Sequence, residues 1–292
     1  MTAAPAAVPL VYQLVDDAGL FPPEALSMAA ATARHRRDRA VRHPALTHRF
    51  LCPADRLPEL VDTLGPEDHF RLGLITRLDA ATLRGVLPRL TADPRIQLAG
   101  VEGPLPSGTD HPRAAAQRAL AALREIPAQV PGYVEVPLTE DRPSMRAVLS
   151  VLADGGRAAK VRCGGIHAVL FPSSAWLGAF VHACATAGVP FKATVGLHQA
   201  VRHRDQRTGF THHGFLNLLL AVCRVVDGGT VDDAVAALES TDAQALAAEA
   251  HQLSPGTADA ARALFVAYGS CSTSEPLDDL RALGLAEGEG AV

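Results

Sequence analysis

The sequence predicts a single (β/α)8 barrel, and three observations support this prediction. The chain has 292 residues, and an α/β barrel needs about 250. Hydrophobic residues make up 48% of the chain and aromatic residues only 4%, which suits an aliphatic core covered by Ala- and Leu-rich helices. From residue 9 onward, short apolar runs alternate with longer segments of helical period, as in repeated strand–helix units. We therefore expect one domain over residues 1–292.

Eight strand–helix units follow one another along the chain. The strands are expected at 10–15, 48–52, 70–76, 96–101, 133–137, 158–162, 191–195 and 264–269. The helices are expected at 24–42, 54–64, 79–91, 111–124, 142–154, 174–187, 214–226 and 276–283. Start signals support several helices, namely Asp79, Ser173 or Ser174, and Ser272 three residues ahead of Glu275.

The seventh unit breaks this rhythm, because a long segment separates its helix from the last strand. Within it, Thr230 opens one extra helix and residues 240–253 form another. We interpret residues 228–256, with approximate bounds, as a helical insertion between strands seven and eight and not as a second domain.

Charge and composition exclude several partners. A net charge of -4 and a pI near 6.3 give no field that would gather nucleic acid. No apolar stretch approaches the roughly 18 residues that span a bilayer, and the N-terminus lacks a signal peptide, so we expect a cytoplasmic protein without a membrane partner. The five cysteines are widely spaced, which predicts reduced thiols and no zinc or iron–sulfur site. The sequence leaves a homo-oligomer open.

Ionisable residues inside the predicted strands are the informative ones, because a strand of a closed barrel is buried on both faces. Alternation places Lys160 and Arg162 on one face of strand six, and Lys192 with Thr194 on one face of strand seven. Glu135 adds a carboxylate on strand five. Glu102 follows strand four. We expect these side chains to converge at the C-terminal mouth of the barrel.

Two lysines and an arginine in one place depress the pKa of a lysine, because each cation disfavours another positive charge. A neutral amine is a nucleophile that forms a Schiff base with a carbonyl substrate, and Glu135 or Glu102 can then move protons. The alternative is a buried ion pair of Glu135 and Lys160 that only fixes the barrel interior. That pair alone would not account for Lys192 and Arg162.

A candidate anion site follows the last strand at Gly269, Ser270, Cys271 and Ser272. Small residues and a helix N-terminus favour a bound anion, and barrels often hold phosphate after strands seven and eight. The turn Gly164-Gly165 after Arg162 offers further backbone donors. The alternative is a loop that only caps a helix.

The loop 196–213 after strand seven contains His198, His203, His212 and His213, which suits a lid over an anionic substrate. Metal-ligand spacing such as HExxH or HxH is absent, so we expect no metal and no cofactor, and interpret these histidines as substrate contacts or solvent-facing residues. Cys163 and Cys271 stand at predicted strand ends, and we interpret both as small packing residues.

Three segments of the C-terminal half resemble the deoxyribose-phosphate aldolase family of class I aldolases. They are Lys160-Val161-Arg162-Cys163-Gly164, Lys192-Ala193-Thr194-Val195-Gly196 and Gly269-Ser270-Cys271-Ser272. The resemblance implies that Lys160 is the Schiff-base lysine and Lys192 the neighbour that lowers its pKa. Three features depart from the family pattern: Arg162 replaces a small hydroxyl residue, Glu102 is a loose counterpart of the strand-four acid, and the insertion is not typical.

The sequence thus predicts an aldolase- or lyase-type enzyme for a small phosphorylated or carboxylated carbonyl compound. Lys160 is the amine, Glu135 and Glu102 are acid/base candidates, and Arg162 with the loop 269–272 holds the anion. Two alternatives stay open. One is a cofactor-independent sugar-phosphate isomerase or epimerase. The other is a non-catalytic barrel that binds an anionic metabolite.

Overall fold

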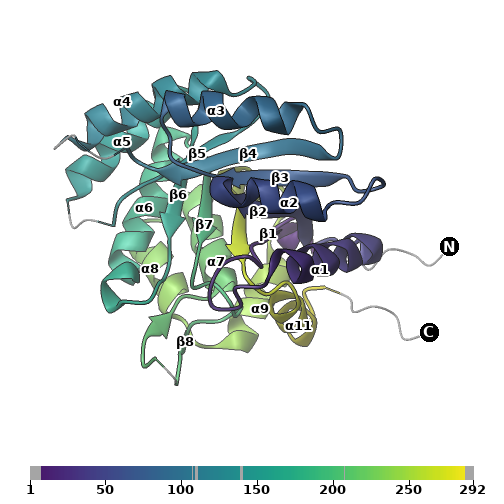
Figure 1. Cartoon of the computed structure of the whole chain (residues 1–292). Coiled ribbons are helices and arrows are strands. Elements are labelled where there is room, and N and C mark those ends of the chain that lie inside the picture. The colour runs from purple at the N-terminus through teal and green to yellow at the C-terminus, as the bar shows by residue number, and fades with distance from the viewer. Residues whose placement is uncertain (1–7, 107, 109–110, 139–140, 207, 287–292) are drawn as a thin grey trace, which may run out of the picture.

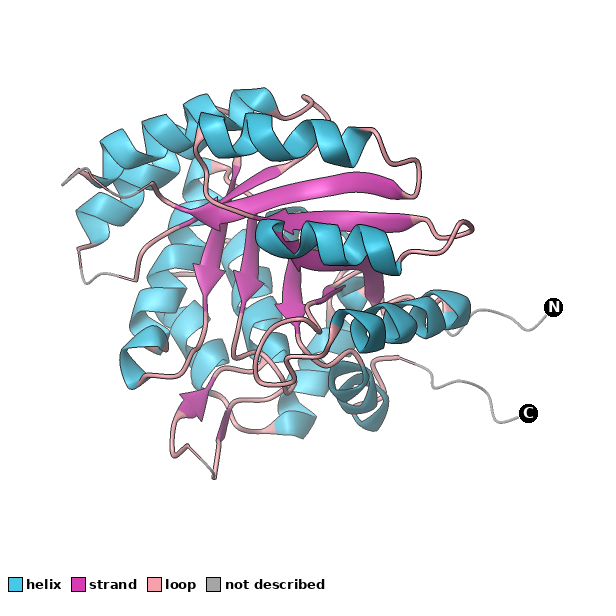
Figure 2. Cartoon of the chain, viewed as in Figure 1, coloured by secondary structure: helices cyan, strands magenta, loops and turns pink. Residues whose placement is uncertain are grey.

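Eight parallel strands close into a barrel with helices around it, which confirms the predicted (β/α)8 fold (Figures 1 and 2). The computed structural model describes residues 8–106, 108, 111–138, 141–206 and 208–286, so both ends of the predicted domain 1–292 lie outside the described residues. The strands are hydrogen-bonded in the order β1-β10-β7-β6-β5-β4-β3-β2. Their bounds are β1 Val15–Asp17, β2 Leu46–Pro53, β3 Phe70–Ile75, β4 Ile96–Pro104, β5 Gly132–Glu135, β6 Ala158–Arg162, β7 Phe191–Thr194 and β10 Phe265–Ser270.

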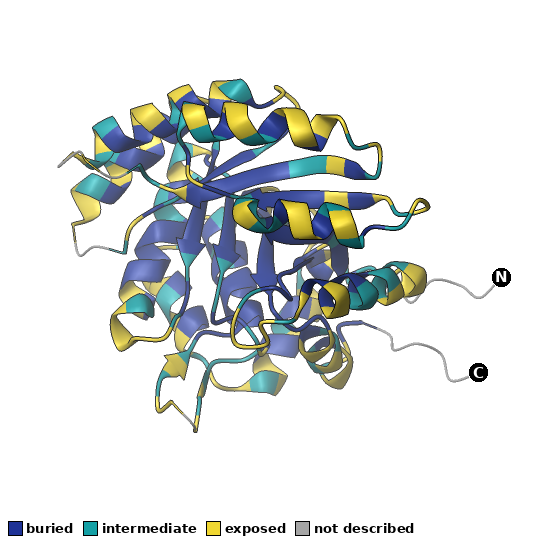
Figure 3. Cartoon of the chain, in the orientation of Figure 1, coloured by how far each residue is buried: buried dark blue, intermediate teal, exposed yellow. Residues whose placement is uncertain are grey.

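The outer ring is built from α-helices that follow the strands. They are α1 Met28–Val41, α2 Leu57–Thr63, α3 Ala80–Thr91, α4 Pro112–Ala122, α5 Arg142–Asp154, α6 Ser174–Ala187, α7 Phe215–Val226, α8 Val231–Glu239, α9 Ala243–Gln252, α10 Pro255–Leu264 and α11 Ser274–Ala282. A small hairpin of β8 (His203–Arg204) and β9 (Thr211–His212) projects from the loop after β7. Figure 3 shows buried strands inside the barrel and exposed outer faces on the helices.

Two predicted helix starts are confirmed by side-chain caps. The Asp79 carboxylate accepts a hydrogen bond from the Thr82 backbone N–H at 2.8 Å, and the Ser173 hydroxyl accepts one from Trp176 at 3.1 Å. Each cap satisfies a backbone donor that the first turn of a helix leaves unpaired. These caps fix where α3 and α6 begin.

The first predicted strand, 10–15, is wrong. Pro9–Val11 forms a short 3-10 helix, because Pro9 fixes its own φ and suits a first helical position. Gln13 then has a φ of 47°, which interrupts the extended backbone, and the barrel strand begins only at Val15. Asp16 therefore lies within β1, in the wall of the barrel.

The insertion is longer than predicted and contains three helices instead of two. α8 packs against α6 and α7, and the Arg224–Glu249 ion pair at 2.7 Å joins α7 to α9. The third helix, α10, was missed although Ser254 caps it and Pro255 opens it. Buried leucines of the insertion, such as Leu238 and Leu246, belong to the main hydrophobic core.

One segment, Ala168–Ala187, is long and apolar enough to cross a bilayer, whereas the sequence was expected to hold none. Half of it is buried in the protein, and most of it is helix α6 of the ring. A core helix meets the same criteria of length and composition.

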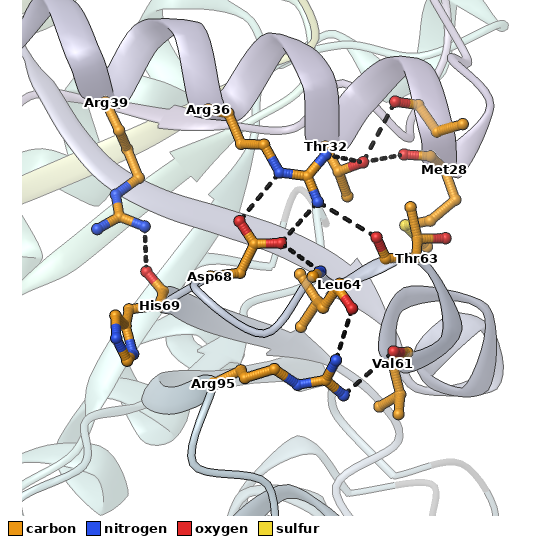
Figure 4. Close-up of polar contacts among 12 residues, drawn as sticks. Met28, Thr32, Arg36, Arg39, Val61, Thr63, Leu64, Asp68, His69 and Arg95 are labelled. Atoms are coloured by element: carbon orange, nitrogen blue, oxygen red, sulfur yellow. Dashed lines mark hydrogen bonds and ion pairs between the residues drawn. The ribbon is translucent and has the colours of Figure 1, made fainter.

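At the N-terminal end of the barrel, two arginines hold the ring together (Figure 4). Arg36 on α1 forms two hydrogen bonds with Asp68, at 3.0 and 2.6 Å. Arg95, just before β4, donates to the backbone oxygens of Leu64 and Val61 at 2.6 and 3.2 Å. These bonds satisfy carbonyl groups that the end of α2 leaves unpaired.

Candidate active site

Strand register brings the predicted charged residues of β5, β6 and β7 to one level of the barrel. Glu135 pairs with Lys160, and Lys160 pairs with Lys192. Both ammonium groups meet the carboxylate of Glu102 on β4: Lys160 Nζ lies 3.0 Å from Oε2, and Lys192 Nζ donates to Oε1. Glu102 therefore bridges the two lysines.

Lys192 also contacts Asp16 of β1, a residue that the sequence interpretation missed. Asp16 is held from β2, because the Thr47 hydroxyl donates to it at 2.6 Å and Arg49 Nη1 at 3.1 Å. The Lys192 ammonium lies 5.1 Å from the centre of the Tyr133 ring. With 1% of its surface exposed, Lys192 is enclosed between two carboxylates and an aromatic face.

Glu135 and Arg162 form the outer part of the same cluster. Glu135 Oε2 lies 3.9 Å from Lys160 Nζ, and Arg162 Nε donates to Glu135 Oε1 at 3.1 Å. Both side chains are partly exposed, unlike Glu102. The cluster thus runs from an enclosed end at Lys192 to a solvent-facing end at Arg162.

Electrostatics separate the two predicted acid/base carboxylates. Burial alone would raise the pKa of Glu102, but the charges of Lys192 and Lys160 outweigh it and lower this pKa to about 2. Glu102 is therefore ionised at neutral pH and is a poor proton donor. Its position suits a fixed charge that holds both lysines, which leaves Glu135 as the better proton carrier.

A cavity of about 370 Å³ opens above the cluster at the C-terminal ends of the strands. Lys160, Glu135 and Arg162 line it, whereas Lys192 and Glu102 are not part of its wall. The rest of the wall includes the apolar side chains of Phe21, Leu51, Ile75, Ile166 and Leu170. Only one of the two amines is therefore open to a bound molecule.

The other predicted residues divide into two groups. Thr194, Gly165, His198, Gly269 and Cys271 line the cavity. Gly164 instead packs against Gly196, where a Cβ atom would approach the Gly196 Cα to 2.9 Å, and Ser270 and Ser272 are buried outside the cavity wall. Gly164 and the two serines are thus near the site without facing it.

Acidic residues accompany the predicted anion loop. Ser272 caps the Glu275 backbone N–H at 3.3 Å, as the helix-start signal predicts. The Glu275 carboxylate lies 3.7 Å from His198, whose ring is 3.5 Å from the Cys271 sulfur. Burial raises the pKa of Glu275, and the nearby Glu24 and Asp279 raise it further. This concentration of carboxylates disfavours an anion beside α11.

The predicted histidine loop does not gather its imidazoles around one point. His203 and His212 stack across the small hairpin with ring centres 5.2 Å apart, and His213 is buried with Nε2 2.8 Å from the Pro172 carbonyl. Burial is the main cause that lowers the pKa of His213 to about 4. Within the described part of the chain, no three His, Cys, Asp or Glu side chains are placed to hold a metal ion.

The small number of lysines in the chain is a further sequence signal for this cluster. The chain has 27 lysines and arginines, and only two of them, Lys160 and Lys192, are lysines. Arginine cannot lose its proton near neutral pH, whereas lysine can act as an amine. The chain therefore uses arginine for its other side-chain cations and keeps its lysines for this cluster.

No protein-family model matches the chain, and no curated protein matches it. The site is therefore interpreted from its own geometry and from the fold. A (β/α)8 barrel is a fold typical of enzymes, and its active sites lie at the C-terminal ends of the strands, where this cavity lies.

Proposed function

We propose that the protein is a class I lyase of the aldolase type, in which Lys160 forms a Schiff base with a small carbonyl compound. One observation carries this proposal. The Lys160 amine lies on the cavity wall within reach of two carboxylates, while the only other lysine is enclosed beneath it. An amine that faces a largely apolar, partly enclosed cavity is suited to nucleophilic attack.

The reaction begins when the Lys160 ammonium gives a proton to Glu135, directly after a small rotation or through a water. The amine lone pair then forms a bond to the carbonyl carbon as the C=O π bond breaks, and a proton moves from the new nitrogen cation to the oxygen to give a carbinolamine. Loss of water, with a proton from Glu135, leaves an iminium ion. Glu135 is thus the proton carrier for both steps.

The iminium ion then serves as the electron sink for C–C cleavage. A β-hydroxyl group loses its proton to Glu135 and becomes the carbonyl of the departing aldehyde, while the electron pair of the broken bond moves to the iminium nitrogen. Glu135 returns this proton to the enamine at carbon, which regenerates an iminium ion. Water then adds to the iminium carbon, and cleavage of the C–N bond releases the second carbonyl product and the Lys160 amine. Glu102 and Asp16 act around this step by fixing Lys192, whose positive charge faces the reacting nitrogen across Glu102.

Arg162 is the proposed contact for the substrate carboxylate or phosphate. Only its Nε is bonded to Glu135, and its terminal nitrogens have no partner among the described residues. An arginine fork binds such oxyanions through two parallel hydrogen bonds. The loop 269–272 stays a predicted anion contact, and the acidic residues beside it make Arg162 the stronger candidate.

Imine trapping tests the proposal. The full chain is incubated with aldehydes and ketones that carry carboxylate or phosphate groups, reduced with borohydride, digested and analysed by mass spectrometry. We expect an adduct on Lys160, loss of that adduct in Lys160→Arg, and C–C cleavage of the same compound. The Arg95→Ala variant, at the other end of the barrel, is the matched control, with its fold checked by circular dichroism.

Other outcomes would contradict the proposal and favour its alternatives. An adduct on Lys192 would refute the assignment of the amine. Lys160-dependent isomerisation of a sugar phosphate without a reducible imine would favour the isomerase. A ligand-dependent rise in melting temperature without any turnover would favour a binding barrel.

A further inference from the structure

A second hollow lies at the opposite, N-terminal end of the barrel, far from Lys160. It has a volume of about 550 Å³ and is formed by the end of α1 and the starts of β2 and β3. No carboxylate is among the residues that line it. Its chemistry comes from Arg36, Arg39, Arg42, Arg71 and His48, with Tyr12 at its edge. We call it the basic groove.

Three of these arginines lack an acidic partner. Arg36 is bound to Asp68, but Arg39 donates to a backbone oxygen, that of His69, on the side of α1 shown in Figure 4. Arg71 donates to the Thr47 carbonyl at 2.7 Å. The Arg42 guanidinium has no hydrogen-bond or ion-pair partner within the described residues, and only its backbone N–H is bonded, to the Asp38 carbonyl. The groove therefore holds positive charge that no carboxylate among residues 8–286 with a described position neutralises.

His48, which also lines the groove, has an unusual backbone conformation. It lies in β2 with a φ of 54°, a left-handed conformation that costs a non-glycine residue free energy, and its buried Nδ1 has no hydrogen-bond partner. Burial, with the charges of His35, Arg39, Arg71 and Arg42, lowers the pKa of His48 to about 4. A neutral imidazole held among arginines can donate one hydrogen bond to a bound oxyanion from its N–H group.

We propose that the basic groove binds a nucleoside di- or triphosphate. Guanidinium forks without carboxylate partners match phosphate oxygens, and several of them together suit a chain of phosphates more than a single carboxylate. Tyr12 is 52% exposed at the edge, where its ring offers a face for a base. The volume lies in the range of small-molecule sites, about 300–1,000 Å³.

The neighbouring surface gives the ligand a direction. Tyr12 and Arg71 also line an adjoining hollow of about 490 Å³ whose wall includes the carboxylate of Asp259. The other arginines of that wall are already bound within the chain, Arg49 to Asp16 and Arg262 to backbone oxygens. The Asp259 carboxylate therefore disfavours phosphate there, and the phosphates belong beside Arg39 and Arg42. The nucleoside then extends over Tyr12 toward Asp259.

Titration calorimetry of the full chain tests this site with three ligands: ATP, tripolyphosphate and inorganic phosphate. ATP is expected to bind more tightly than tripolyphosphate, and both more tightly than inorganic phosphate. The Arg42→Ala/Arg71→Ala double variant should weaken ATP binding by more than about tenfold. Arg37→Ala is the matched control, since Arg37 is an exposed arginine of α1 outside the groove, and it should change the affinity less than about twofold.

The Tyr12→Ala variant distinguishes the contribution of the nucleoside to binding from that of the phosphates. The substitution should weaken ATP binding by about tenfold, which is the effect of losing one stacked base. The affinity for tripolyphosphate should stay unchanged. Equal affinity for ATP and tripolyphosphate would overturn the nucleoside assignment. Binding of neither ligand, or equal losses in Arg37→Ala and the double variant, would overturn the site itself. All of these variants change exposed side chains, and unchanged melting temperatures confirm their folding.

Discussion

The two ends of the barrel use the same charged groups in different ways. At the C-terminal mouth, Lys160, Lys192, Glu102 and Asp16 are buried and contact one another, with little help from backbone groups. At the N-terminal end, Arg36 and Arg95 are partly exposed and bind backbone oxygens, and Arg36 also binds Asp68 (Figure 4). Arg95 also donates to Asp93. The first arrangement lies beneath a cavity and places only Lys160 in the cavity wall, whereas the second ties a helix to its neighbours.

The difference indicates which charges serve chemistry. Burying four ionised groups costs more free energy than burying apolar side chains of similar volume, so stability alone does not explain the mouth cluster. The hydrogen bonds of Arg36 and Arg95 to backbone oxygens satisfy the end of α2, so they are accounted for by the fold.

The largest effect is expected for Lys192→Met. The substitution leaves Asp16 and Glu102 buried with one cation fewer, and breaking such a pair costs about 3–5 kcal/mol. Urea unfolding followed by circular dichroism measures the loss. A loss below about 1 kcal/mol would show that the two carboxylates do not depend on Lys192 and would contradict the described cluster.

Low pH should remove the contribution of Glu102 to the free energy of unfolding. Its folded pKa of about 2 lies below its ordinary value of 4.5, so folding favours the ionised carboxylate. The stabilisation is complete above about pH 5 and is lost as the pH falls toward 2, and it is on the order of 3 kcal/mol. Urea midpoints measured from pH 7 to pH 2.5 should show a gap between the wild type and Glu102→Gln that narrows with acid. A constant gap would mean that Glu102 has an ordinary pKa.

A smaller effect is expected in the arginine network. Arg95→Ala removes hydrogen bonds to two backbone oxygens and the ion pair with Asp93, so it should lower the urea midpoint less than Lys192→Met does. Imine trapping at Lys160 should be unchanged in this variant, because Arg95 lies at the other end of the barrel. Reduced imine trapping in a folded Arg95→Ala protein would contradict the claim that the arginines at the N-terminal end do not affect the Lys160 site.

The smallest effect is expected for thiol reagents. All five cysteines are free and buried. Burial raises the pKa of Cys163 to about 12 although Arg162 lowers it, and burial is also the main cause that raises the pKa of Cys52 to about 12. Iodoacetamide at pH 8 should therefore leave both thiols unmodified and Lys160 trapping intact. Rapid labelling of Cys163 would show that the backbone at the C-terminal end of β6 opens to solvent.

The sequence carried most of the fold, because apolar runs and helical segments alternate clearly in this chain. It failed where local chemistry overrode the pattern: Pro9 turned an apolar run into a 3-10 helix, and Ser254-Pro255 started a helix inside the insertion.

For the site, alternation within β6 and β7 identified Lys160, Arg162 and Lys192. Asp16 was missed because the first strand was placed too early, although two acids directly after an apolar run were a visible signal. The lining of the cavity by Phe21 and Ile166 depends on how distant loops fold over the mouth, which spacing along the chain does not encode.

Reductive methylation of the folded protein is the most direct measurement of the claim that one amine is open and the other enclosed. With two lysines in the chain, formaldehyde and cyanoborohydride at neutral pH give a simple peptide map. We expect rapid methylation of Lys160, protection of Lys192, and labelling of both after unfolding in urea. Equal labelling in the folded state, or faster labelling of Lys192, would contradict the account.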